Sequence, residues 1–139
     1  MAVRILIADD HPAMRSAIAE LIRLSEQDWE VCGEAENGQD VVEKVGKLKP
    51  DLIIMDLMMP ERDGISASRA IREMLPEPAI VIYSLWVSPF LEREAKEAGI
   101  QAVVQKPNGA GLLAAIRDAI AVRGFRAGGG SPSRGAIPV

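Results

Sequence analysis

The chain has 139 residues, of which 48% are hydrophobic and 26% charged, the proportions of one soluble globular domain. A domain of this size folds without a disulfide or a structural metal, in agreement with its single cysteine, Cys32, which we expect to be a small buried residue of a strand. The net charge of −4 and the pI near 5.1 argue against direct nucleic-acid binding, and no apolar run approaches the roughly 20 residues of a membrane span.

Five strand patterns alternate with five helix patterns along the chain. The strands are short apolar runs, and most helices begin after Pro, Asn-Gly or Asp-Gly signals and end at Gly or Pro. In chain order the sequence predicts a strand over Arg4–Ala8, a helix over Pro12–Leu24, a strand over Trp29–Ala35, a helix from Asn37-Gly38 to before Pro50, a strand from Leu52 that ends at Asp56, a helix from Asp63-Gly64 to before Pro76, a strand over Ala79–Ser84, a helix over about Ser88–Ala98, a strand over Ala102–Gln105 and a helix from after Gly109 to about Arg123.

Apolar residues at helical spacing predict which face of each helix packs on the sheet. Short strands that alternate with helices argue for an α/β fold, an open parallel sheet with helices on both faces. Units of about 25 residues that do not resemble one another exclude a solenoid. The inward residues expected are Met14, Ile18, Leu21 and Ile22, then Val41, Val45 and Leu48, then Ala67, Ala70, Ile71 and Met74, then Leu91, Ala95 and Ala98, and finally Leu113, Ile116 and Ile120.

One domain is expected over residues 1–124. The run Gly-Gly-Gly-Ser-Pro-Ser that starts at Gly128 predicts a flexible tail over residues 125–139. The first residues, Met-Ala-Val-Arg-Ile, lead directly into a strand without the pattern of a signal peptide, so the expected location is cytoplasmic.

The stretch from Leu52 to Gly64 holds the first candidate functional residue. Four apolar residues precede Asp56, as in a strand buried on both faces of a parallel sheet. Because a lone buried carboxylate is costly, Asp56 should lie at the C-terminal tip of its strand, where open α/β sheets bind their ligands.

Other predicted strand tips carry Asp9-Asp10, Ser84 and Lys106. Carboxylates about 4 Å apart repel by about 4 kcal/mol at an effective dielectric constant of 20. Either one carboxylate stays protonated, or a divalent cation lies among them, and this ligand set suits Mg²⁺ better than Ca²⁺. Beside a metal, a lysine and a hydroxyl, the Asp56 carboxylate could accept a phosphoryl group to form an aspartyl phosphate.

These residues resemble the receiver domains of two-component response regulators. The matching fragments are Ile-Ala-Asp9-Asp10-His11, Met-Asp56-Leu-Met-Met-Pro60-Glu-Arg-Asp-Gly64, Ser84 and Lys106-Pro107, in this order. The resemblance covers residues 2 to about 123 and implies a flavodoxin-like fold with strand order 2-1-3-4-5.

The resemblance also implies a role for each residue. Five side chains and one backbone carbonyl would together hold Mg²⁺ and the phosphoryl group. Asp56 matches the phosphoacceptor, Asp9 and Asp10 the acidic pair of the Mg²⁺ site, Ser84 the phosphoryl-binding hydroxyl, Lys106 the phosphate-pairing lysine and Met58 the residue whose backbone carbonyl ligates Mg²⁺.

Two positions depart from the family pattern. Val103 stands where the family usually has the Tyr or Phe that turns inward on activation. Leu85, followed by Trp86, stands where a small residue usually leaves the site open. The family's usual aromatic switch and the access of a phosphoryl donor are therefore both in question.

The resemblance implies a signalling phosphoacceptor rather than an enzyme, with slow self-dephosphorylation and a sensor histidine kinase or phosphotransfer protein as partner. The Asp-Asp-His fragment looks most like the subgroup that usually carries a C-terminal helix-turn-helix output domain. The chain is therefore either a single-domain regulator with an unknown output partner or a fragment without its output domain. It could also form a homodimer.

Two other functions compete with this one. A Mg²⁺-dependent phosphatase of the haloacid dehalogenase type would need Asp-x-Asp after its first strand, and Asp9-Asp10 lacks the spacer. A receiver-like module that binds partners without phosphorylation would fit Val103 and Leu85. His11, the only histidine, is expected to be an exposed helix-entry residue rather than a metal ligand.

Overall fold

The structure is a computed structural model that describes residues 2–122; the tail expected over residues 125–139 lies outside the described residues. Strands and helices alternate as the sequence predicts, with most bounds within two residues of those expected. The elements are β1 (Val3–Ala8), α1 (Pro12–Leu24), β2 (Trp29–Ala35), α2 (Gly38–Leu48), β3 (Leu52–Met55), α3 (Gly64–Met74), β4 (Ala79–Ser84), α4 (Pro89–Glu97), β5 (Ala102–Gln105) and α5 (Gly109–Val122).

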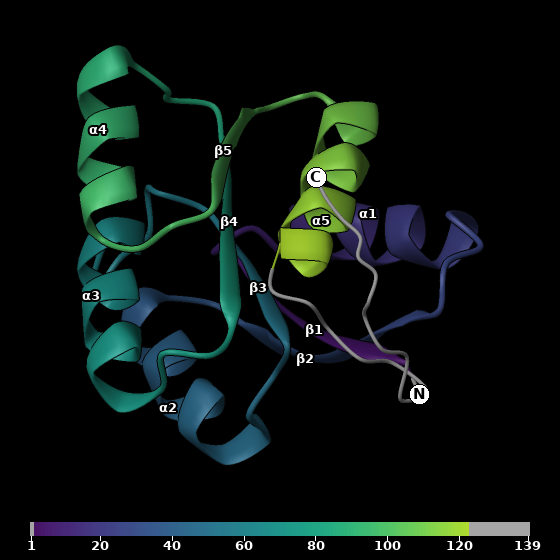
Figure 1. The fold of residues 1–139 in the computed structure, drawn as a ribbon, viewed down its shortest axis with the longest axis horizontal. Coiled ribbons are helices and arrows are strands. Elements are labelled where there is room, and N and C mark those ends of the chain that lie inside the picture. Colours follow the sequence, from purple (N-terminus) through teal and green to yellow (C-terminus); the bar gives the residue numbers. More distant parts are fainter. Residues whose placement is uncertain (1, 123–139) are drawn as a thin grey trace.

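The five strands form one parallel sheet in the order β2-β1-β3-β4-β5, which confirms the expected topology. Helices α1 and α5 cover one face, and α2, α3 and α4 cover the other (Figure 1). Because side chains alternate along a strand, Ile5 and Ile7 pack under α1 and α5 while Leu6 and Ala8 pack under the other three helices.

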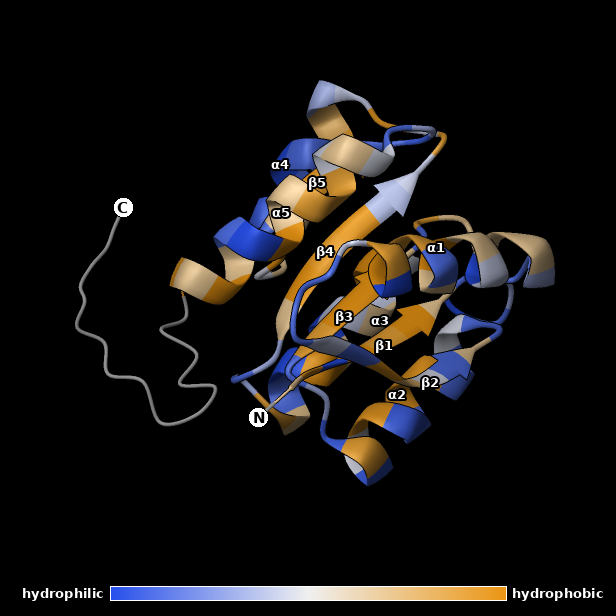
Figure 2. Ribbon diagram, turned by 90° about the vertical axis from the view of Figure 1, so that its right-hand side faces the viewer, coloured by the Kyte–Doolittle hydropathy of each residue, from blue (hydrophilic) through white to orange (hydrophobic). Residues whose placement is uncertain are grey.

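The central strands β1, β3 and β4 are almost wholly buried, as expected for strands covered on both faces, and they form the apolar centre of the molecule (Figure 2). Strand β2 lies at an edge of the sheet and is only partly covered. Cys32 of β2 is therefore half-buried rather than fully buried, although it packs against the core. Its burial raises the pKa of the thiol, so the thiol stays protonated near neutral pH.

Polar side chains cap three of the helices at the predicted starting points. Asn37 accepts a hydrogen bond from the N–H of Asp40, Asp63 from that of Ser66, and Ser88 from that of Leu91. Each cap satisfies one of the free N–H groups in the first turn of its helix. Among residues 2–122, no helix is long and apolar enough to span a bilayer.

Not every expected inward position is buried. Met74 ends α3 with its side chain 45% exposed. On α5 the fully buried residues are Leu112, Ile116 and Ala119. Ile120 is half-buried and packs against this core as expected, whereas Leu113 is half-buried without being part of it. Arg117 and Asp118 are the only charged residues of α5, so spacing alone does not determine which apolar stripe faces the sheet.

Candidate functional site

The parallel register brings several strand ends to one edge of the sheet. Ala8 pairs with Met55, and Met55 pairs with Ile82. The next residues, Asp9 and Asp56, therefore leave the sheet side by side, and the N–H of Asp56 donates a hydrogen bond of 3.0 Å to the carbonyl of Ala8. The predicted placement of these two aspartates at strand tips is confirmed.

Three carboxylates and one imidazole meet at this edge. Asp9, Asp10, His11 and Asp56 each present one potential ligand atom, and these atoms all lie within 4.8 Å of one another. Asp9 and Asp56 are buried, Asp10 is half-buried and His11 is exposed. His11 is the N-cap residue of α1, as expected, but its side chain makes no capping hydrogen bond.

Lys106 brings one positive charge into this acidic cluster. Its Nζ lies 2.6 Å from Oδ2 of Asp9 and 3.2 Å from Oδ2 of Asp56, and all three side chains are buried. Burial lowers the pKa of Lys106, but the hydrogen bond to Asp9 and the charges of Asp56 and Asp9 outweigh burial and raise it. The ammonium therefore stays charged and offsets part of the repulsion between the carboxylates.

The negative charge of Asp10 is only partly compensated by its neighbours. Its Oδ1 is buried and has no hydrogen-bond partner within the described residues, although Nδ1 of His11 lies 3.1 Å away. A buried carboxylate oxygen without a partner is costly in free energy. Carboxylate oxygens are the ligands that hard divalent cations prefer. The carboxylates of Asp9, Asp10 and Asp56 therefore fit the divalent cation that the sequence predicts.

Ser84 is fully buried at the end of β4, beside the acidic edge. Its hydroxyl accepts a hydrogen bond of 3.4 Å from the N–H of Trp86, so it is tied to the loop that follows β4 rather than to Asp56. Leu85 and Trp86 in this loop are exposed. The site therefore has an apolar rim on the β4 side.

The loop after β3 holds Asp56 through close backbone contacts. The N–H of Met58 donates a hydrogen bond of 3.3 Å to Oδ1 of Asp56, and the N–H of Gly64 donates one of 2.9 Å to the carbonyl of Leu57. A Cβ at Gly64 would collide with the carbonyl oxygen of Asp56, so this position requires glycine. The Met58 side chain is exposed, which leaves the predicted Mg²⁺ role to its backbone carbonyl.

Two residues that the sequence analysis missed support the site. Arg15 of α1 donates a hydrogen bond of 2.7 Å to the carbonyl of Asp9 and pairs with Glu34 at 2.9 Å. The ring of Tyr83 lies 5.8 Å from Nζ of Lys106. The only sequence signals for them are their positions, near the start of the helix that follows the acidic pair and directly before Ser84.

Tyr83 also helps to fix the segment that presents Lys106. Its hydroxyl accepts a hydrogen bond of 2.9 Å from the N–H of Asn108, two residues after Lys106. The Lys106–Pro107 peptide bond between them is cis. The side chain of Asn108 in turn accepts a hydrogen bond of 2.9 Å from the N–H of Gly111, in the first turn of α5.

The model of the response regulator receiver domain family matches residues 5–117. The chain is 38% identical over 107 residues to the chemotaxis protein CheY of Thermotoga maritima, which covers 77% of this chain and 88% of CheY. The crystal structure of the response regulator domain of T. maritima CheB superimposes with a TM-score of 0.80 at 31% identity, covering 86% of this chain and 97% of that one.

Other similar proteins are longer than this chain. A protein-glutamate methylesterase/protein-glutamine glutaminase of Syntrophus aciditrophicus is 37% identical over 108 residues, which are 76% of this chain but 31% of that protein. For the response regulator VraR of Staphylococcus epidermidis, the match covers 82% of this chain and 54% of that protein at 33% identity. The chain thus spans about a third to a half of these relatives.

Proposed function

Because this chain belongs to the family of response regulator receiver domains, we propose that it accepts a phosphoryl group on Asp56. Receiver domains are the signalling phosphoacceptors of two-component systems. The observation that supports the assignment to Asp56 is its position directly after β3, where its carboxylate lies 3.2 Å from the buried ammonium of Lys106 and within 4.8 Å of ligand atoms of Asp9 and Asp10. Membership of this family also decides against the haloacid dehalogenase type of phosphatase.

The proposed reaction is a transfer to a carboxylate oxygen. An oxygen of Asp56 forms the new bond to phosphorus, and the bond from phosphorus to the leaving group of the donor breaks, with the electron pair going to the leaving group. Charge on the transferring group is spread over its equatorial oxygens, so a buried cation beside them lowers the barrier. Lys106 supplies this cation from its position between Asp9 and Asp56.

Mg²⁺ would be held by Asp9, Asp10, Asp56 and the backbone carbonyl of Met58, which is the same ligand set that the sequence predicts. When bound, the ion would neutralise the carboxylates and the incoming phosphoryl oxygens. The support from this structure is the convergence of the three carboxylates and the buried Oδ1 of Asp10, which accepts no hydrogen bond from the described part of the chain. The Ser84 hydroxyl would donate a hydrogen bond to a phosphoryl oxygen once its present hydrogen bond from the N–H of Trp86 has broken.

A sensor histidine kinase or a phosphotransfer protein is the proposed phosphoryl donor. The longer relatives act as a methylesterase/glutaminase or a response regulator, and those activities belong to proteins of which this chain covers only a part. The output, whether a separate partner or a domain beyond this chain, stays a prediction, as do a homodimer and a cytoplasmic location.

Acetyl phosphate with Mg²⁺ tests the proposal. Mass spectrometry should show one added phosphoryl group on the unaltered protein and none on Asp56→Asn. Asp63→Asn is the matched control, because Asp63 is an exposed aspartate a few residues along the same loop and Asn also caps helices well. Full labelling of Asp56→Asn would overturn the assignment. If neither the unaltered protein nor any variant were labelled, a receiver-like module that binds partners without phosphorylation would be favoured.

A further inference from the structure

Tyr83 contacts the segment of Lys106 in two separate ways. Its hydroxyl accepts a hydrogen bond of 2.9 Å from the N–H of Asn108, and its ring lies under the Lys106 ammonium, with Nζ 5.8 Å from the ring centroid. The first contact holds the backbone two residues after Lys106, and the second lies at the charged end of its side chain. Tyr83 therefore acts on both ends of the residue that brings positive charge into the acidic cluster.

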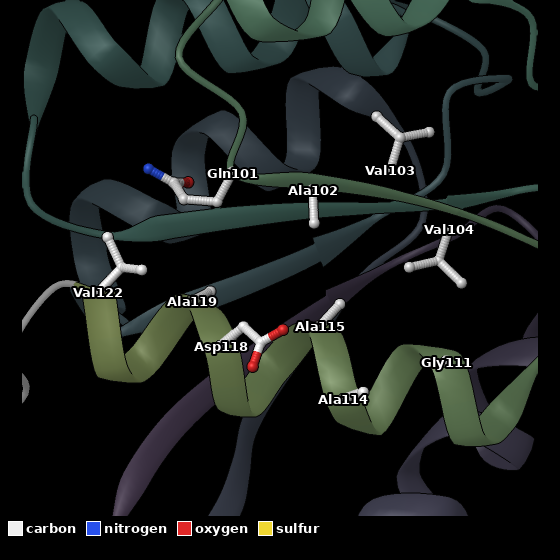
Figure 3. Close-up of a pocket in the computed structure, with 10 residues that line it drawn as sticks. All are labelled: Gln101, Ala102, Val103, Val104, Gly111, Ala114, Ala115, Asp118, Ala119 and Val122. Atoms are coloured by element: carbon white, nitrogen blue, oxygen red, sulfur yellow. The ribbon is translucent and has the colours of Figure 1, made fainter. Parts of the chain in front are cut away.

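The strand register explains how Tyr83 reaches this segment. Tyr83 of β4 pairs with Val104 of β5, and both residues pack in the core on the α1 and α5 face of the sheet. Val104 accordingly points toward α5 (Figure 3). The next pair is Ser84 and Gln105, and the N–H of Lys106 donates a hydrogen bond of 2.9 Å to the carbonyl of Ser84. Lys106 thus leaves β5 directly beside the end of the strand that carries Tyr83.

Both partners of the ring contact are buried, with Tyr83 6% and Lys106 8% exposed. A cation over the face of an aromatic ring is attracted to it within about 6 Å, and the attraction is stronger when both groups are removed from water. Two of the three donors of the ammonium are directed to Asp9 and Asp56. The ring is therefore a further favourable neighbour of the ammonium, in addition to the two carboxylates.

The position of the ammonium matters for phosphoryl transfer. Lysine carries a point charge at the end of a flexible stem, and a cation stabilises developing charge best when it is already in place. Asp9 and Asp56 attract the ammonium, but both are also proposed Mg²⁺ ligands, so their hold on it competes with the ion. The contacts with Tyr83 involve no proposed Mg²⁺ ligand and are compatible with a bound ion.

We propose that Tyr83 is a positioning residue for phosphoryl transfer, whose ring and hydroxyl keep the Lys106 ammonium beside Asp56. This inference rests on the proposed function, since Lys106 assists the transfer only if Asp56 accepts the phosphoryl group. Tyr83 acts through Lys106 rather than on the reacting atoms. Its ring and its hydroxyl hold different parts of the Lys106 segment, so their effects should be separable by substitution.

Two substitutions separate the hydroxyl from the ring. Tyr83→Phe removes the hydroxyl and keeps the ring, whereas Tyr83→Leu removes both and leaves a large apolar side chain in the core. With acetyl phosphate and saturating Mg²⁺, Tyr83→Phe should be labelled about threefold more slowly than the unaltered protein, because one neutral hydrogen bond is lost. Tyr83→Leu should be labelled about thirtyfold more slowly, because a buried cation–π contact is lost as well.

Val81→Ala is the matched control for lost packing. Val81 lies two residues before Tyr83 on β4, is fully buried and belongs to the same part of the core. The control should lose stability, because truncation of a buried side chain leaves a cavity. At a temperature at which thermal melts show every variant to be folded, it should nevertheless be labelled at the rate of the unaltered protein.

Mg²⁺ affinity distinguishes positioning of Lys106 from general damage to the site. Both Tyr83 variants keep every proposed Mg²⁺ ligand, so calorimetry should show that they bind the ion at least as tightly as the unaltered protein. Only the labelling rate should fall. A loss of Mg²⁺ affinity that matches the loss of labelling rate would mean that the substitution deforms the acidic cluster, and the proposal would be wrong.

The Lys106 ammonium can also be observed without phosphorylation. Its buried, hydrogen-bonded protons should exchange slowly enough to give a resonance in proton–nitrogen NMR spectra at mildly acidic pH, and Lys106→Met assigns this resonance. Protons over the face of a ring are shielded. The resonance should therefore move downfield or disappear in Tyr83→Leu and should change little in Tyr83→Phe, which keeps the ring.

Equal labelling rates in the unaltered protein and Tyr83→Leu would overturn the proposal. It would also be overturned by a Lys106 resonance that is absent from the unaltered protein or unchanged in Tyr83→Leu. Failure of the proposed function would look different, because the unaltered protein itself would then take up no phosphoryl group. The role of Tyr83 in transfer would fall with that function, and the ammonium resonance would show separately whether Tyr83 holds Lys106.

Discussion

Lys106 donates its shorter hydrogen bond to Asp9 rather than to Asp56, at 2.6 Å against 3.2 Å. The lysine therefore pairs most closely with one of the proposed Mg²⁺ ligands and only secondarily with the proposed phosphoacceptor. Release of Asp9 would let the ammonium turn fully toward Asp56, where an added phosphoryl group brings a charge of about −1.5 to −2.

The pairing of Lys106 should stabilise the fold over a defined pH range. Asp9 and Asp56 raise the pKa of Lys106 above its ordinary value of 10.5 against the opposing effect of burial. A raised pKa gives stabilisation that is fully present below pH 10.5 and is lost as the pH rises through the folded-state value. Urea unfolding should show Lys106→Met to be less stable than the unaltered protein by about 2 kcal/mol at pH 8. The difference should shrink only above pH 10.5.

The control for this measurement is Lys96→Met, because Lys96 is an exposed lysine of α4. It should show no comparable change between pH 8 and pH 11. A difference for Lys106→Met that vanished already between pH 8 and pH 9 would contradict the direction of the pKa shift.

Asp10→Asn should stabilise the metal-free protein while it weakens Mg²⁺ binding. The substitution removes a charge whose buried Oδ1 has no hydrogen-bond partner in residues 2–122, and this should raise the free energy of unfolding in EDTA by about 1 to 2 kcal/mol. Mg²⁺ should raise the melting temperature of the unaltered protein but not that of the variant. Thermal melts with and without Mg²⁺ measure both effects. A loss of stability in EDTA would show that the Asp10 carboxylate is satisfied in the fold.

Gly64→Ala should damage the site, whereas Gly46→Ala should not. A methyl group at Gly64 meets the carbonyl of Asp56, so the loop must shift, at a cost of about 1 to 3 kcal/mol, and labelling by acetyl phosphate should slow. Gly46 lies in α2, and an added Cβ would meet no atom within 4 Å in residues 2–122 apart from its chain neighbours and its own helix backbone, so alanine there should stabilise by about 0.5 to 1 kcal/mol. Equal labelling rates in both variants would contradict the proposed role of the close contact.

The loop after β4 is our candidate for transmitting phosphorylation. Val103 is too small to act as the family's usual aromatic switch, and one neutral hydrogen bond supplies only about 0.5 to 1.5 kcal/mol of the about 5.5 needed to reverse a strongly biased two-state equilibrium. The Ser84 hydroxyl is bound to the N–H of Trp86. If Ser84 turns toward a phosphoryl group, the loop over residues 85–89 loses this contact and should shift Trp86 and Phe90.

Trp86 fluorescence reports this movement directly. Trp86 is 64% exposed, so its emission should respond to a change in its surroundings. In a Trp29→Phe background, beryllofluoride with Mg²⁺ should change the emission, and Ser84→Ala should abolish the change. An unchanged spectrum beside a confirmed adduct on Asp56 would mean that the signal leaves through another surface or that none is sent.

The ends of the strands were predictable from the sequence because they combine two strong signals. A strand buried on both faces is continuously apolar, and an aspartate that directly follows it, Asp9 or Asp56, marks its end because a carboxylate is costly to bury without a charged partner. Helix starts were equally clear at Asn37, Asp63 and Ser88, whose side chains cap locally. Both signals involve only a few neighbouring residues, so they can be recognised in the sequence without the tertiary structure.

The features that sequence analysis missed depend on contacts between distant segments. Arg15 reaches the carbonyl of Asp9, and Tyr83 reaches the N–H of Asn108; backbone groups of this kind leave no trace in the side-chain pattern. On α5 the choice of Leu112 over Leu113 depends on how the helix is rotated against the sheet. An almost wholly apolar sequence does not encode that rotation.

The hydrogen bonds of Lys106 link segments that are far apart in the sequence, which bears on when the site forms during folding. They join residues 97 and 50 positions apart in the chain, and they link the segment after the edge strand β5 to the ends of β1 and β3. Contacts of such long range repay their loop-closure entropy only after the intervening strands have paired. We therefore expect the acidic cluster to acquire its counter-charge late in folding, so that a partly folded chain would present Asp56 without Lys106.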